Sequence, residues 1–123
     1  MALDIPEQKV QRAIFFAQGD CVVLQGEIDQ NDPDVFLDPF FKKVCEQMGE
    51  SITLDITRLN FLNSAAISCL LEFIMNRKPR TRVTIKVDKS KGWQRYSINV
   101  VQALDADNII LEDFKNSAEV SES

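Results

Sequence analysis

The segment SITLDITRLNFLNSAAISCLLEFIMNRK, residues 51 to 78, contains the change of pattern that decides the fold. Apolar Ile52, Leu54 and Ile56 alternate with polar residues, and this period of two predicts a strand with one buried face. After Asn63, a good helix N-cap, the apolar residues recur at the spacing of one helix face. Those residues are Ile67, Leu70, Leu71 and Ile74. The segment therefore predicts a strand, a short loop and a helix whose apolar stripe packs on the sheet.

The same two periods predict elements on either side of this segment. Two apolar runs flank Gly19-Asp20, which predicts a tight β-hairpin. A short turn is expected at Asp32-Pro33, before a separate helix that starts at Pro39. The strands expected outside the central segment are 13–18, 21–28, 83–87 and 108–111, and the helices are 39–48 and 93–104.

The order β-β-α-β-α-β-α-β predicts a single α/β domain. Its sheet is expected to be mixed and four- to five-stranded, to start with the hairpin and to carry the helices packed on it. We assign the domain to residues 12–113. Residues 1–11 are predicted to be a flexible N-terminus, and residues 114–123 an acidic, disordered tail.

The composition excludes several classes of function. The net charge of −5 and the pI near 4.7 argue against nucleic acid or an anionic membrane as partner, and no basic cluster is expected. The longest apolar run, around residues 65–75, is too short to cross a membrane. The chain has no histidine and no Gly-rich phosphate loop, so no enzyme activity, metal or cofactor is expected. Three cysteines without a CxxC motif predict reduced thiols and a cytoplasmic protein; they are Cys21, Cys45 and Cys69.

A few polar residues could carry chemistry, and for most of them an ordinary structural role is favoured. Asp55 is interpreted as a solvated charge or a local cap. The acidic residues near the end of the domain favour a solvated loop over a cation site; they are Asp105, Asp107, Glu112 and Asp113. Trp93 is expected to dock its helix onto the sheet rather than to face a partner. Ser64, beside the N-cap, could accept a phosphate at the positive end of the helix dipole, although the local residues favour plain capping.

The order of elements and three short motifs resemble the STAS domain, the fold of bacterial anti-sigma-factor antagonists. Residues 54–57, LDIT, resemble the family's LDLS-like strand, and residues 61–67, FLNSAAI, resemble its F-[IM]-DSSG-[LM] loop. Residues 24–29, LQGEID, and 103–105, ALD, are similar to its L-x-G-E-L-D and G-L-D motifs. The resemblance implies a non-enzymatic regulator that acts by protein–protein binding in partner switching.

The loop departs from the family pattern at the positions that matter for the switch. Family members are phosphorylated on the second residue of a Ser-Ser or Ser-Thr pair, and that residue is Ala65 here. The preceding aspartate is Asn63 and the glycine is Ala66. Three interpretations stay open: Ser64 has taken over the modification, the protein is a constitutively binding member, or it is a STAS-like module with different regulation.

The resemblance also implies a binding surface and its partners. With the apolar stripe of the helix turned to the sheet, the opposite face and the loop before it become the predicted partner-binding residues. They are Asn63, Ser64, Ala65, Ala66, Ser68, Cys69, Glu72 and Phe73. The implied partners are a serine kinase of the anti-sigma type and an opposing phosphatase. Alternatives are a scaffold or homo-oligomer subunit of a larger signalling or transport assembly, and a small ligand-binding domain.

Overall fold

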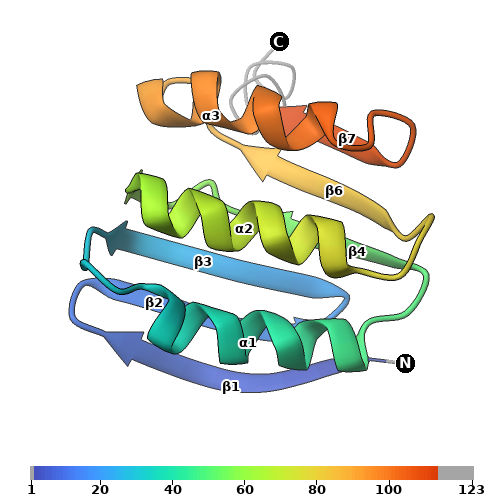
Figure 1. Cartoon of the computed structure of the whole chain (residues 1–123), viewed down its shortest axis with the longest axis horizontal. Coiled ribbons are helices and arrows are strands. Elements are labelled where there is room, and N and C mark those ends of the chain that lie inside the picture. Colours follow the sequence, from blue (N-terminus) through green and yellow to red (C-terminus); the bar gives the residue numbers. More distant parts are fainter. Residues whose placement is uncertain (1, 114–123) are drawn as a thin grey trace, which may run out of the picture.

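The computed structural model describes residues 2–113, and within them the chain forms one sheet and three helices (Figure 1). The strands are β1 (Leu3–Val10), β2 (Ala13–Gly19), β3 (Cys21–Ile28), β4 (Ser51–Asp55), β5 (Leu59–Leu62), β6 (Arg82–Val87) and β7 (Ile109–Asp113). The helices are α1 (Asp34–Gln47), α2 (Ser64–Asn76) and α3 (Gly92–Ala103). The predicted α/β class is confirmed.

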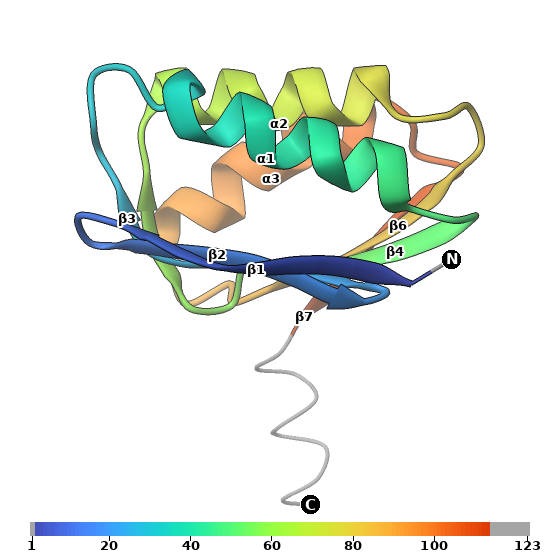
Figure 2. The ribbon, with the colours of Figure 1, turned by 90° about the horizontal axis from the view of Figure 1, so that it is seen from below.

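The sheet is mixed, with the strand order β1-β2-β3-β4-β6-β7. β1, β2 and β3 form an antiparallel meander, whereas β4, β6 and β7 run parallel to β3. β5 continues beyond β4 and also pairs with β3. Figure 2 shows that all three helices cover the same face of the sheet. The sheet therefore has seven strands instead of the four to five predicted, because β1 and β5 were missed.

β1 corrects the prediction of a flexible N-terminus. Residues 3–10 pair with β2, and Leu3 and Ile5 are buried in the core. These are the only two alternating apolar residues before Val10 in a mostly polar segment, so the local pattern is weak. The pairing with β2 stabilises a strand that the segment does not specify alone. The tail predicted at residues 114–123 lies outside the described residues.

α1 begins five residues earlier than predicted and joins the expected turn and helix into one. Pro39 lies inside it. A proline there has no N–H to donate to the carbonyl of Val35. Val35 is exposed, so water can reach that carbonyl, and the helix continues. The extra turn brings Leu37 into the core beside Phe40, Phe41 and Val44.

α3 begins and ends within one residue of the predicted bounds. Its buried side carries Ile98 and Val101, whereas Val100 and Leu104 are exposed. Gln94 is buried as well, because its amide donates to the carbonyls of Ile56 and Leu59, at 2.7 and 3.0 Å. Trp93 is half-buried, and its indole N–H also donates to the Leu59 carbonyl, which confirms that it docks this helix.

Arg77 fastens the end of α2 to the loop after α3. Its buried guanidinium donates to the carbonyls of Ile74 and Thr81 and to the Asp105 carboxylate, with Nη2 at 2.6 Å from Oδ2. Hydrogen bonds from Arg77 and Asn108 hold the pKa of Asp105 below its usual value. A depressed pKa means that the ionised carboxylate stabilises the fold above the unfolded-state pKa, near 3.9.

We therefore expect the Asp105→Asn variant to be less stable than the parent protein at pH 7. The difference in unfolding free energy should stay constant down to about pH 5 and shrink as the pH falls below about 4, where Asp105 becomes protonated in both states. Urea unfolding at a series of pH values measures this. Asp107→Asn, an exposed neighbour, is the control and should change stability by less than ~0.5 kcal/mol. If the difference in unfolding free energy between Asp105→Asn and the parent protein does not decrease below about pH 4, the stabilising role of the ionised Asp105 is contradicted.

Gly26 is required by a close approach of two strands. It lies opposite Ala13 with φ of +87°, and a Cβ added to it would lie 1.9 Å from the Arg12 carbonyl oxygen. At this point the pairing of β3 with β5 shifts register, and the Glu27 N–H donates to the same Arg12 carbonyl. No side chain fits here without moving backbone atoms.

Gly26→Ala should therefore destabilise the protein by about 2–4 kcal/mol, since left-handed strain adds to backbone overlap. Chemical denaturation measures the loss. Gly92→Ala is the matched control: an added Cβ there meets nothing within 4 Å. That variant should be neutral or more stable by up to ~1 kcal/mol. Equal changes in unfolding free energy for the two variants would show that position 26 does not require glycine.

Candidate partner-binding site

Asn63 fixes the start of α2 through both ends of its side chain. Its Oδ1 accepts from the Ala66 N–H at 2.9 Å, which confirms the predicted N-cap. Its Nδ2 donates to the Gln30 carbonyl at 2.8 Å, and its backbone N–H donates to the Ile28 carbonyl at 3.0 Å. The loop before α2 is thus tied to the chain that leaves β3. The contact with Gln30 spans 33 positions, and no local pattern predicts it.

Ser64 and Ala65 form the exposed first turn of α2. Neither backbone N–H has a hydrogen-bond partner among residues 2–113, whereas those of Ala66 and Ile67 are satisfied by Asn63. Free N–H groups at the positive end of a helix dipole favour an anion. The Ser64 hydroxyl is therefore accessible and lies where a phosphate would be tolerated.

The structure corrects the predicted binding face of α2. Ser68 and Glu72 are exposed as expected, but Ala66, Cys69 and Phe73 are buried. The reason is that α2 packs on two surfaces, the sheet and α1. The ring of Phe73 stacks on Phe41 of α1, with centroids 4.7 Å apart. The prediction considered the sheet alone and so placed the α1-facing side in solvent.

A hollow of 320 Å³ remains between α1 and α2. It is lined by both helices, with Cys45 and Cys69 among the lining residues. Burial raises the pKa of the Cys69 thiol to about 12, and the nearby Asp38 acts in the same direction. Burial also raises the pKa of Cys45. All three cysteines are free thiols, as predicted, and high pKa values make these two poor nucleophiles.

The other polar candidates have local roles. Asp55 accepts from the N–H and hydroxyl of Thr57, at 3.0 and 2.7 Å, so it is a local cap. Within residues 2–113, no group of His, Cys, Asp and Glu could hold a metal ion. None of the helices in this part of the chain is long and apolar enough to cross a membrane.

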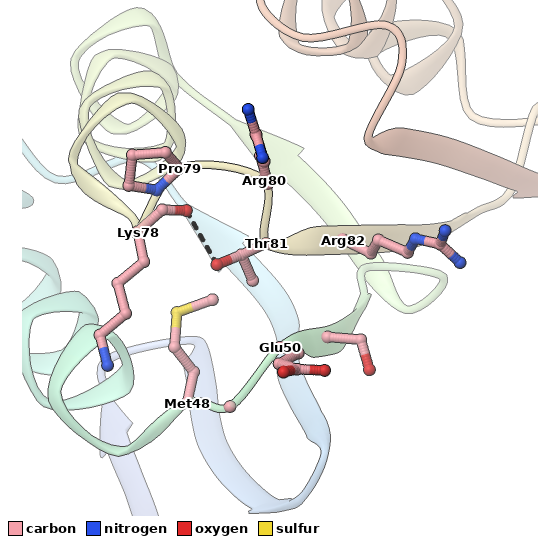
Figure 3. Close-up of a pocket in the computed structure, with 9 residues that line it drawn as sticks. Met48, Glu50, Lys78, Pro79, Arg80, Thr81 and Arg82 are labelled. Carbon is pink, nitrogen blue, oxygen red and sulfur yellow. Dashed lines mark hydrogen bonds between the residues drawn. The ribbon is translucent and has the colours of Figure 1, made fainter.

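A second hollow, of 610 Å³, lies at the other end of α2 (Figure 3). It is formed where α1 leads into β4 and where α2 leads into β6, and none of the predicted site residues lines it. It is lined by Met48, Gly49, Glu50, Ser51, Lys78, Pro79, Arg80, Thr81 and Arg82. In Figure 3 the side chains of Lys78, Arg80 and Arg82 point in different directions, so they do not converge on one ligand.

The architecture now compares directly with solved structures. An anti-sigma factor antagonist from Mycobacterium paratuberculosis is similar at a TM-score of 0.60 and 12% identity, over 95% of this chain and 91% of that chain. The anti-sigma factor antagonist SpoIIAA, in its unphosphorylated form, gives a TM-score of 0.53 at 12% identity, over 96% of each chain. The chain has the fold of the anti-sigma factor antagonists. The resemblance to the STAS fold is therefore confirmed at the level of architecture.

Comparison of the sequence with family models and curated proteins does not reveal this relationship. No family model and no curated protein matches it. In this fold the motif FLNSAAI spans the end of β5, the N-cap Asn63 and the first turn of α2. The exposed residues of the predicted site are Ser64, Ala65, Ser68 and Glu72.

The two roles of Asn63 can be separated by substitution. Asn63→Ala removes the cap and the bond to Gln30 and should cost about 2 kcal/mol of unfolding free energy. Asn63→Asp keeps a capping oxygen but has no donor for the Gln30 carbonyl, and it should cost about 1 kcal/mol. Urea unfolding at pH 7 measures both. Ser68→Ala, which removes an exposed bond to the Ser64 carbonyl, is the control and should cost less than ~0.5 kcal/mol. Wild-type stability of Asn63→Asp would show that the bond to Gln30 contributes nothing.

Proposed function

We propose that this chain is a non-enzymatic regulator that acts by binding another protein in a partner-switching pathway. The observation that carries the proposal is the exposed start of α2, held rigidly by Asn63, on the fold of anti-sigma factor antagonists. A fold alone does not define a function. Here the fold is joined by an accessible helix start that could dock on a partner and whose interaction a phosphate would oppose.

The chain binds its partner without a switch at the family phospho-position. Ala65 occupies that position and has no hydroxyl. Ser64 directly precedes it in the chain, and it is exposed. A phosphate there would bring about −1.5 to −2 charges into the interface and weaken binding by repulsion and desolvation. Ser64 is therefore the candidate phosphorylation site, and an unmodified Ser64 gives a constitutive binder.

The partner proposed from the resemblance is a cytoplasmic serine kinase of the anti-sigma type. An opposing phosphatase is needed only where Ser64 is modified. The mass of the protein purified from its native host separates these two forms. An added phosphate on Ser64 indicates a phosphorylation switch one residue before the family position, Ala65. A protein that is unmodified under all growth conditions indicates a constitutive binder.

Affinity capture from the native host tests the function itself. The tagged parent protein should capture an ATP-binding kinase, and Ser64→Asp should reduce its recovery at least tenfold, about 1.4 kcal/mol of binding free energy. Val35→Asp is the control, because Val35 is an exposed residue of α1 that lies outside the proposed interface. Its recovery should equal that of the parent protein. Equal recovery by Ser64→Asp, or the absence of any kinase among the captured proteins, overturns the proposal.

A further inference from the structure

The large exposed apolar side chains of this protein are unevenly distributed. Four of the seven found in residues 2–113 lie on α2, on α3 or at the C-cap of α3. They are Met75, Tyr96, Val100 and Leu104, with exposed fractions of 63%, 74%, 55% and 44%. On α3 these residues recur every fourth position, which places them along one side of the helix. Single exposed apolar residues are ordinary, but a continuous row of them marks an interaction surface.

The row on α3 and Met75 on α2 face each other. Phe73 packs on α1, and at about 100° per residue Met75 points about 200° away from it, toward α3. Leu71, one turn before Met75, is half-buried on the same side. On α3, Gln102 bonds to the Ile109 carbonyl of the edge strand β7, and Val100 points about 200° away from it, toward α2. We call the set Leu71, Met75, Tyr96, Val100 and Leu104 the α2–α3 face.

The part of the chain that carries this face is strongly basic. Residues 64–104 contain eight Lys or Arg and two acidic residues, a net charge of +6, whereas the rest of the chain carries −11. The total charge of −5 hides this asymmetry. Lys78, Arg80 and Arg82 follow directly after α2, are exposed, and form no ion pair with a described residue.

Ser64 lies on the same side of α2 as this face. It precedes Met75 by eleven residues, which corresponds to about 20° of rotation and about 16 Å along the helix axis. A partner segment of about eleven helical residues spans that length. One segment could therefore contact the α2–α3 face and reach Ser64.

We infer that the α2–α3 face binds an acidic amphipathic helix of the partner protein. This inference rests on the proposed function and specifies its partner. The apolar side of the helix would cover Met75, Val100 and Leu104, as in other helix-in-groove complexes. A carboxylate of this helix would meet Arg80, which is exposed just after α2, and the pairing would fix the register and speed association. A phosphate on Ser64 would repel the same acidic helix. Exposed aliphatic side chains suit a protein partner better than a nucleic acid.

Two designed peptides provide the probe. Both have fifteen residues and the same leucines at i, i+3, i+4 and i+7, but the flanking positions are Glu in one and Lys in the other. Titration into the ¹⁵N-labelled full chain should show at least tenfold tighter binding of the Glu peptide. The backbone amide shifts should concentrate around Met75, Val100 and Leu104. The difference should diminish as salt is raised.

Matched variants localise the binding. Met75→Asp and Val100→Asp should each weaken the Glu peptide at least tenfold, and their melting temperatures should stay close to that of the parent because both sites are exposed. Val35→Asp is the control, since Val35 is 71% exposed on α1 and outside the face. Arg80→Glu should also weaken binding, whereas Lys43→Glu, exposed on α1, should not.

Several results overturn the inference. These are equal affinity for the two peptides, shifts confined to the groove between α1 and α2, and displacement of the Glu peptide by a DNA duplex. A dimer of the parent protein that Val100→Asp dissociates would show that a second copy covers the face. The peptide assay needs no native partner. Peptide binding without capture of a kinase would therefore support the α2–α3 face as a binding surface and contradict the proposed function. Capture of a kinase without peptide binding would support the proposed function and contradict the inference about the face.

Discussion

The stacking of Phe41 on Phe73 determines which side of α2 the protein presents to solvent. The two rings lie 4.7 Å apart and 17° from parallel. Phe41 also contacts Phe40, which packs edge-on against Phe15 in the core. Aromatic pairs of this kind contribute beyond their buried area. Because α2 is held between the sheet and α1, its free side is rotated toward α3. The exposure of Ser64, Ser68 and Met75 on α2 follows from this rotation.

α3 is attached in a different way, and this difference leaves the apolar row uncovered. Polar bonds fix its start, through Trp93 and Gln94 to the carbonyls of Leu59 and Ile56. The ion pair between Arg77 and Asp105 fixes the chain just after its end. Hydrogen bonds and an ion pair at the two ends position α3 without requiring all of its apolar side chains to pack against α2 or the sheet. The apolar side chains that α3 buries are Ile98 and Val101, which leaves Val100 and Leu104 exposed.

The sequence predicted well wherever the pattern of one segment determines its structure. The alternation of Ile52, Leu54 and Ile56, the cap at Asn63 and the hairpin at Gly19-Asp20 are all local, and each is confirmed. Predictions failed where a distant element decides. β1 depends on its pairing with β2, and the burial of Cys69 and Phe73 depends on α1. When an amphipathic helix packs against two neighbours, a prediction that considers only the sheet assigns only the sheet-facing residues correctly.

Asn63 and Ala65, two residues at which the loop departs from the family pattern, together make the start of α2 less charged and less open to modification. An aspartate at position 63 could cap α2, but it has no donor for the Gln30 carbonyl, which lies 2.8 Å from the Asn63 amide. The amide satisfies both neighbours at once and adds no charge beside the exposed helix start. At Ala65 the missing hydroxyl removes the group that the family modifies. A neutral, doubly bonded cap and a neighbour without a hydroxyl suit the proposed constitutive binding, in which the surface acts through its geometry and charge.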